Sequence, residues 1–355
     1  MARNSNHLVI MAGGVGSRFW PMSTEEKPKQ FIDVLGVGRS LLQLTLDRFE
    51  SICLPENVWV VTNKRYFDTV REQLPEVPAS NILCEPCRRN TAPCIAYVSW
   101  RIKSVDPHAN IVVTPSDHLV TNPIEFRKVI TQCLQFTSES DSIVTLGIKP
   151  TRPETGYGYI QADLASSSAR NKGIFRVDAF HEKPNLPTAK EYIKDPSYLW
   201  NSGIFIWSLS TIVNAFRVYQ PNMSKFFESL MPVYGTPEEQ AIIDERYAEC
   251  ENISVDYAIM EKAEEIFVRP SDFGWSDLGT WGSLLTQTKT DLYGNGVIGQ
   301  NVSLYESHNC IVHTTQEKKV VIQGLDGYIV AEQNGTLLIC KLSEEQRIKQ
   351  FSGNQ

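Results

Sequence analysis

A glycine-rich turn with cations close behind it is the part of the sequence best suited to chemistry. The stretch "MAGGVGSRFWPMSTEEKPKQF" near the N-terminus places Gly13, Gly14 and Gly16 directly after an apolar run. Glycines let backbone N–H groups approach a phosphate chain closely. Arg18 offers several donors on one planar group, and Lys29 offers a point charge. The pattern indicates a phosphate-binding loop; the alternative is a tight turn with solvated cations.

Two well-known glycine-rich motifs do not fit this turn. A P-loop needs a Gly-Lys-Ser or Gly-Lys-Thr ending, which the stretch lacks. A dinucleotide-binding turn needs three glycines in the pattern G-x-G-x-x-G, but Phe19 stands at the third position. The loop therefore predicts phosphate binding of another kind.

Two aspartates stand where predicted strands end. Asp117 lies in "TPSDH" and Asp277 in "GWSDLGTW", each at a strand-to-helix junction. Ligands of open α/β sheets bind beyond such ends, and paired carboxylates suit Mg²⁺ with phosphate oxygens completing its shell. Each aspartate taken singly could instead cap a helix.

The stretch "EPCRRNTAP" joins an acid to a helix start. Glu85 and Asn90 could read the edge of a nucleobase with hydrogen-bonding groups. An ordinary capped helix explains the same residues nearly as well. The sequence leaves both interpretations open.

Polar residues farther along the chain could bind a sugar phosphate. Lys183 in "HEKP" is a candidate phosphate contact, and Asn201 in "WNSGIF" and Asp256 in "SVDYAIME" could meet sugar hydroxyls. Alternatively, Asn201 is a turn residue and Asp256 an acid at the start of a helix, where the helix dipole favours it.

Other reactive residue types form no convincing site. Cys84 and Cys87 make a single C-x-x-C without the second pair that zinc would need. His308 and His313 lie on a β-rich segment without acidic or thiol neighbours in sequence. No Ser-His-Asp or Cys-His arrangement stands out, so covalent catalysis is not expected.

The elements that must position these residues alternate between strand and helix. Strands are expected at 7–11, 58–62, 110–117 and 142–148, with helices at 41–49 and 92–103. Such alternation predicts an α/β fold with a doubly wound, mostly parallel, Rossmann-like sheet.

The pattern of expected strands and helices changes twice after this alternating region. From Gly156 onward β-rich insertions are expected, followed by a helix over 254–265 with Ser254 as N-cap and another starting near Thr280. After about Asp291, short apolar pieces alternate with Asn-Gly and Asp-Gly turns. We therefore predict a catalytic domain at 1–290 and a β-rich module at 291–355, coiled in the manner of a left-handed β-helix.

Composition narrows the class of protein. The chain has 355 residues with 42% hydrophobic and 21% charged, typical of a globular protein with a sizeable core. A net charge of −7 argues against broad nucleic-acid binding. No stretch has signal-peptide or membrane-spanning character, so a cytoplasmic protein with reduced thiols at its eight cysteines is expected.

The ordered set of motifs resembles the sugar nucleotidyltransferases, and among them the mannose-1-phosphate guanylyltransferases (GDP-mannose pyrophosphorylases) in their short bacterial form. The resemblance covers nearly the whole chain, from "AGGVGSRFWPMS" with "KPKQF" through "EPCRRNTAP", "TPSDH", "TGYGYI", "EKP", "WNSGIF" and "SVDYAIME" to "WSDLGTW". Met22 and Ser116 depart from the residues commoner in the family, but neither removes a charge. Longer relatives carry a cupin-like isomerase domain, and no isomerase activity is expected here.

The resemblance implies roles for particular residues. They are Gly13, Gly14, Gly16, Glu85, Asn90, Thr91 and Ser116 for the nucleotide; Arg18, Lys29 and Lys183 for catalysis through the phosphates; Gly156, Glu182, Lys183, Asn201 and Asp256 for the sugar phosphate; and Asp117 and Asp277 for Mg²⁺.

The implied reaction joins GTP and mannose 1-phosphate into GDP-mannose and pyrophosphate, in a protein expected to be a homodimer. Catalysis would consist of aligning two anions and neutralising charge. Another sugar 1-phosphate such as fucose or heptose 1-phosphate, a non-catalytic sensor of nucleotide sugars, and a glycosyltransferase are the alternatives.

Overall fold

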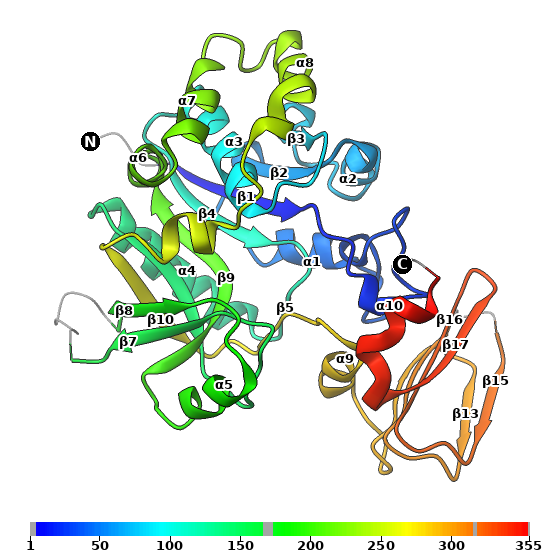
Figure 1. The fold of residues 1–355 in the computed structure, drawn as a ribbon. Coiled ribbons are helices and arrows are strands. Elements are labelled where there is room, and N and C mark those ends of the chain that lie inside the picture. The colour runs from blue at the N-terminus through cyan, green and yellow to red at the C-terminus, as the bar shows by residue number, and fades with distance from the viewer. Residues whose placement is uncertain (1–4, 166–172, 315–317, 354–355) are drawn as a thin grey trace. The chain divides into compact units, whose positions relative to one another are not determined.

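The computed structural model describes residues 5–165, 173–314 and 318–353 (Figure 1). Its chain divides into two compact units. The larger unit comprises Met1–Gly13, Asp47–Pro115 and Val120–Trp275, and the smaller unit comprises Gly14–Leu46, Ser116–Leu119 and Ser276–Gln355. Within the described ranges, no helix is both long and apolar enough to cross a membrane.

The larger unit contains a nine-stranded sheet in the order β3-β2-β1-β4-β9-β6-β10-β8-β7. Its strands are β1 (Asn6–Ala12), β2 (Val58–Asn63), β3 (Ile82–Glu85), β4 (Asn110–Pro115), β6 (Ile143–Ile148), β7 (Tyr159–Asp163), β8 (Phe175–His181), β9 (Tyr198–Ser208) and β10 (Ile266–Ser271). The short strands β5 (Leu119–Val120) and β11 (Trp275–Ser276) lie outside this sheet. The strands expected from the first part of the sequence are confirmed.

The direction of the strands differs from the prediction. Parallel pairing joins β1 to β2 and β4, β2 to β3, and β6 to β10. Antiparallel pairing joins β9 to β4, β6 and β7, and β8 to β7 and β10. The expectation of a mostly parallel sheet is therefore wrong. An apolar run reveals a strand but not its direction, and β9 enters between β4 and β6 in reverse.

Helices of the larger unit bury their apolar faces on this sheet and on one another. They are α2 (Phe67–Gln73), α3 (Thr91–Lys103), α4 (Pro123–Ser138), α5 (Leu186–Tyr192), α6 (Leu209–Tyr219), α7 (Pro221–Ser229) and α8 (Pro237–Arg246). Helix α3 packs on β1, β2, α6 and α7, and α4 packs on β4, β6, β9 and β10. Asn122 caps α4 and Pro123 occupies its first turn, as expected for a helix start.

The helix expected over 254–265 is replaced by a shorter element. Residues Asp256–Met260 form a single π-helical turn, preceded by Ser254, whose hydroxyl accepts a hydrogen bond from the Tyr257 amide at 3.4 Å. Sequence periodicity cannot distinguish this wide turn from an α-helix. Single π-helical turns occur frequently at functional sites.

The smaller unit contains the C-terminal strands, whose pairing is mostly parallel. They are β12 (Gly296–Ile298), β13 (Val302–Tyr305), β14 (Ile311–His313), β15 (Val320–Gln323), β16 (Tyr328–Gln333) and β17 (Thr336–Lys341). Figure 1 shows β13 beside β15 and β16 beside β17. Parallel pairing of β12, β14 and β16, and of β13 and β15, is what a coiled β module requires. The left hand of the coil stays a prediction.

The opening loop shares a core with these strands. Helices α1 (Leu41–Asp47), α9 (Trp281–Gln287) and α10 (Ile348–Phe351) accompany them. Phe19 and Leu41 belong to the same buried apolar cluster as Trp281 and Ile329. The glycine-rich turn is therefore held by packing against segments far away in sequence, and the predicted boundary near residue 290 stays a prediction.

Candidate functional site

Lys29 is the centre of a tightly bonded cluster in the smaller unit. The residue is 2% exposed. Its Nζ lies 3.0 Å from Asp117 Oδ2 and donates to the backbone carbonyls of Asp277 at 2.8 Å and Leu278 at 2.9 Å. An ammonium has three N–H donors, so each of them has an acceptor. The structure thus brings a predicted phosphate contact together with the carboxylate of Asp117 and the backbone of Asp277.

Local backbone geometry makes room for this lysine. Gly16 has φ +66°, and a Cβ added there would lie 2.5 Å from Lys29 Cβ. Leu278 also adopts a positive φ, +44°, at the point where its carbonyl meets the ammonium. The Phe19 ring lies 5.5 Å from Nζ. Gly16 is therefore needed for the packing of Lys29, whatever it does for a nucleotide.

The aspartates of this cluster offer hard oxygen atoms. Desolvation alone would raise the pKa of the Asp117 carboxyl, but Lys29 and then His118 hold that pKa below its usual value. Asp277 accepts a hydrogen bond from the Gly279 amide through Oδ1 at 3.0 Å. The described residues form no group of three or more metal-ligating side chains. Carboxylate oxygens are the hard ligands that Mg²⁺ prefers, and the ion usually keeps several waters beside them.

Arg18 contrasts with Lys29. It is half-buried, and its guanidinium has no hydrogen bond or ion pair with any residue that the structure describes. Gly14 is exposed, and its carbonyl accepts from Gln30 Nε2 at 2.9 Å. Ser116 is buried, and its carbonyl accepts from the Thr45 hydroxyl at 3.2 Å. Of these groups, the Arg18 side chain is the one available to an anion.

Glu85 lies at the end of β3 in the larger unit and is 7% exposed. The Tyr247 hydroxyl donates a hydrogen bond to its Oε1. A Cβ added at Gly13 would lie 3.5 Å from its Oε2. Burial raises the pKa of Glu85 to about 7, against the lowering effect of Tyr247. The carboxylate therefore lies beside the first glycine of the loop.

The start of α3 is joined to the segment that precedes Asp256. Asn90, with φ +66°, accepts from the Thr91 amide through its side chain at 3.0 Å. The Thr91 hydroxyl accepts from the Val255 amide at 2.9 Å, and the Ala92 amide donates to the Ile253 carbonyl at 3.1 Å. Asn90 is a helix cap in this structure, which is one of the two interpretations left open by the sequence.

Asn201 and Asp256 meet in the larger unit. Asn201 Nδ2 donates to Asp256 Oδ1 at 3.0 Å, and Asn201 Oδ1 accepts from the Thr145 hydroxyl and the Gly203 amide, both at 3.1 Å. Burial and the nearby Glu182 raise the pKa of Asp256 to about 6. The two predicted sugar-binding residues are thus held in a fixed mutual orientation.

Lys183 joins this group through its neighbour in sequence. Its Nζ lies 2.7 Å from Glu182 Oε1, with 61% of the Lys183 side chain exposed and 7% of the Glu182 side chain. Desolvation would lower the pKa of Lys183, but Glu182, Asp256 and Tyr257 outweigh it and raise that pKa. A mostly exposed cation therefore lies at the edge of a partly buried acidic pair.

Comparison with known proteins supports a common origin over most of the chain. Residues 7–293 match the family described as Nucleotidyl transferase. The chain belongs to the nucleotidyl transferase family. A mannose-1-phosphate guanylyltransferase of Escherichia coli is 34% identical over 96% of this chain and 74% of that protein. One from Salmonella montevideo is 35% identical over 97% of this chain and 72% of that protein.

A solved structure agrees with the fold of this nucleotidyl transferase. The crystal structure described as a mannose-1-phosphate geranyltransferase from Thermus thermophilus has a TM-score of 0.87 and 30% identity. The match covers 98% of each chain. The protein therefore has a mixed α/β nucleotidyltransferase fold with C-terminal β sheets.

Several contacts of this nucleotidyl transferase were missed by sequence reasoning. A Cβ at Gly158 would lie 2.6 Å from Glu182 Oε2, whereas one at Gly156 would meet only Glu154, at 3.3 Å. The second glycine of "GYGYI" was the available signal for this approach. Tyr247 gave no signal, since it lies 162 positions from Glu85.

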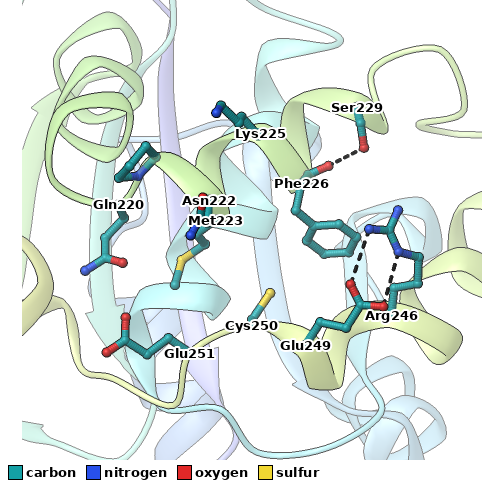
Figure 2. A pocket seen from close by; sticks show the side chains of 11 residues that line it. Gln220, Asn222, Met223, Lys225, Phe226, Ser229, Arg246, Glu249, Cys250 and Glu251 are labelled. Carbon is teal, nitrogen blue, oxygen red and sulfur yellow. Dashed lines mark hydrogen bonds and ion pairs between the residues drawn. The ribbon is translucent and has the colours of Figure 1, made fainter.

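A separate hollow of about 580 Å³ lies between α7 and the segment after α8 (Figure 2). Its lining residues are Gln220, Pro221, Asn222, Met223, Lys225, Phe226, Ser229, Arg246, Glu249, Cys250 and Glu251. Figure 2 shows the Arg246–Glu249 ion pair at its rim, with Arg246 also over the Phe226 ring. None of the predicted site residues lines it.

Proposed function

We propose that this nucleotidyl transferase transfers GMP from GTP to α-D-mannose 1-phosphate, giving GDP-mannose and pyrophosphate. The observation that carries the proposal is its 34% identity with a mannose-1-phosphate guanylyltransferase across 96% of the chain. Two features, one in each of the two units, support it. A half-buried arginine without a partner among the described residues follows the glycine-rich turn, and an exposed lysine lies beside Asp256 and Asn201.

The reaction joins two anions that repel each other. A phosphate oxygen of mannose 1-phosphate attacks the α-phosphorus of GTP in line, a new P–O bond forms, and the bond to the β-phosphate breaks. Arg18 stabilises negative charge on the leaving pyrophosphate, and Lys183 holds the sugar phosphate. No covalent intermediate with the protein is needed. This agrees with the motifs, which contain no nucleophilic side chain coupled to a general base.

Asp117 and Asp277 would hold Mg²⁺, because carboxylate oxygens are the hard ligands that this ion prefers. When bound, the ion would neutralise charge on the phosphates. Lys29 keeps these two segments together, and its own contact with phosphate stays a prediction. Gly13, Gly14 and Gly16 would let the loop backbone approach the nucleotide.

Glu85 would read the guanine, whose N1–H and 2-amino group both donate hydrogen bonds. A carboxylate is an acceptor-only group and suits that edge. Asn90 and Thr91, bonded to each other at the start of α3, would lie near the base. A homodimer also belongs to this proposal, with exposed Leu337 and Ile339 of β17 as candidate contacts.

The test is release of pyrophosphate from a panel of nucleoside triphosphates and sugar 1-phosphates. The expected result is activity with GTP and mannose 1-phosphate above all other pairs, including fucose and heptose 1-phosphates. The Arg18→Ala variant should lose at least about two orders of magnitude in turnover, as for the removal of one charge-stabilising donor. The exposed Lys27 of the same loop gives the control Lys27→Ala, which should remain active. A wild-type chain that releases no pyrophosphate with any pair would refute the proposal.

A further inference from the structure

The buried carboxylate of Glu85 is held on one side only. Tyr247 donates to Oε1, and within the described residues Oε2 has no hydrogen-bond partner. Oε2 is also the atom that faces Gly13. Glu85 is 7% exposed, and Oε2 is not among the fully buried side-chain atoms without a partner, so this oxygen can be reached from outside. Oε1 is therefore fixed by Tyr247, and Oε2 is available to accept a hydrogen bond from a ligand.

Tyr247 reaches Glu85 because its segment is tied to β3. Helix α8 immediately precedes it, and Gln240 Nε2 of that helix donates to the Cys84 carbonyl at 3.1 Å. Lys64, just after β2, pairs with Asp244 at 2.7 Å. The Tyr247 ring itself is fully buried and packs against Tyr97. These contacts hold the Tyr247 hydroxyl in position beside Glu85.

Three titratable side chains lie around the Glu85 carboxyl group. Cys84 precedes it on β3, and Cys94 faces it from α3. Burial raises the pKa of the Cys84 thiol to about 11 and that of Cys94 well above its usual value, so both are neutral near pH 7. Burial likewise raises the pKa of Tyr247 well above its usual value, which leaves it a donor. Tyr247 is therefore the neighbour that favours the ionised form of Glu85.

We infer that Tyr247 is a positioning residue for nucleobase selection: its hydroxyl donates to Oε1 of Glu85 and fixes the carboxyl group, so that Oε2, the oxygen that faces Gly13, selects guanine over adenine. This inference rests on the proposed function, in which Glu85 reads the base. An ionised carboxylate accepts from the N1–H and 2-amino group of guanine. Adenine presents an acceptor lone pair at N1, which an ionised carboxylate repels, whereas a protonated carboxyl group can donate its O–H to it.

The test is the binding of GTP, ITP and ATP, without sugar phosphate, to wild type and Tyr247→Phe between about pH 6 and about pH 8.5. Removal of the hydroxyl leaves burial unopposed, so the pKa of Glu85 rises further. The variant should bind GTP about tenfold more weakly near neutral pH, and the pH midpoint for GTP binding should move upward by about one unit. ITP, which lacks the 2-amino group, should lose less than GTP, and ATP should lose nothing.

A matched control exists in the same aromatic cluster. The buried Tyr97 hydroxyl donates to Glu239 Oε1 at 2.9 Å, so Tyr97→Phe removes the same kind of bond without touching Glu85. Tyr97→Phe should leave the preference for GTP over ATP and the pH midpoint unchanged. Glu85→Gln should bind GTP weakly at every pH, with no midpoint in this range.

Three results would overturn the inference. They are equal losses for GTP and ATP in Tyr247→Phe, an unmoved pH midpoint in that variant, and the same shift in Tyr97→Phe. Failure of the proposed function would look different. A wild-type chain that prefers GTP in binding but releases no pyrophosphate would refute the reaction while leaving the role of Tyr247 intact.

Discussion

Lys29 and Lys183 are both marked by the sequence as phosphate contacts, yet they lie in opposite surroundings. The Lys29 side chain is 3% exposed and bonded to three oxygens, whereas the Lys183 side chain is 61% exposed and paired with one carboxylate. Lys29 joins segments far apart in sequence, but Lys183 pairs with the residue beside it. One lysine therefore organises the fold around the predicted metal ligands, while the other remains available to a ligand.

This difference shows what a motif can and cannot say about a cation. Phosphate sites need cations that are within reach of the ligand, but they also need cations that hold acidic ligands together before the substrate arrives. Both kinds of lysine occur within motifs of this family, Lys29 in "KPKQF" and Lys183 in "HEKP". Burial and the number of oxygen partners separate them, and neither property can be read from the residue type.

The largest loss of activity is expected from substitution of the two proposed Mg²⁺ ligands, which lie on the segments that Lys29 joins. Asp117 contacts Lys29 through its carboxylate, but Asp277 does so through its backbone carbonyl. Loss of either carboxylate as a Mg²⁺ ligand should cost several kcal/mol in the transition state, or about two to three orders of magnitude in turnover. Asp117→Asn and Asp277→Asn should each show this loss, and the double variant should lose little more, because ligands of one ion act as a unit.

Direct titration with Mn²⁺ gives a readout of these variants besides activity. Both single variants should bind the ion more weakly than wild type. If Asp117 only balances the charge of Lys29, Asp117→Asn will lose stability while Asp277→Asn keeps its activity and its Mn²⁺ affinity. That outcome would rule out the two-carboxylate site.

Much of the sheet and the loop could be predicted from the sequence. The buried runs of β1, β2, β4 and β6 are continuous and apolar, and the glycine turn follows β1 as expected. Pairing direction was not predictable, because β9 reads the same in either orientation. The partners of Lys29 were not predictable either, since the Leu278 carbonyl that it meets lies 249 positions away and belongs to the backbone.

The sequence predicted which residue types belong to the candidate site better than it predicted which residues contact one another. Asn201 and Asp256 were assigned together, and a direct hydrogen bond joins them. Tyr247 and Thr145 escaped notice because a hydroxyl that orients another side chain carries no motif of its own. Gly158 was missed because the role was assigned to Gly156, two residues earlier in the same motif, and the distance from Gly158 to Glu182 depends on strand register.

The next effect concerns stability and tests the contrast between the lysines directly. Lys29→Met removes a buried charge and leaves the Asp117 carboxylate and two carbonyls without their donor. We expect a loss of about 3 kcal/mol in the free energy of unfolding, measured by urea denaturation. Lys183→Met removes a mostly exposed cation and leaves one carboxylate without its donor, so it should cost less, about 1 kcal/mol.

The pH dependence of this stability difference has a definite sign. Lys29 contributes to lowering the pKa of Asp117, so the stabilisation is present above the unfolded pKa of that carboxyl and is lost as pH falls through the lowered folded value. The gap between wild type and Lys29→Met should therefore narrow in acid. A Lys29→Met protein as stable as wild type at neutral pH would show that the cluster does not organise the fold.

The smallest effect is expected from Lys183, and it is one of binding. Lys183→Ala should raise the KM for mannose 1-phosphate by about tenfold, the value of one charge-assisted hydrogen bond, and change the KM for GTP much less. Removal of the lysine also leaves Glu182 and Asp256 without their nearest cation, so Glu182→Gln with Lys183→Ala serves as the control for repulsion of the sugar phosphate by the unpaired acid. If the KM for mannose 1-phosphate stays high in that double variant, the weaker binding comes from the missing ammonium. Equal rises in KM for both substrates would show instead that Lys183 serves the nucleotide or the fold, and the contrast with Lys29 would disappear.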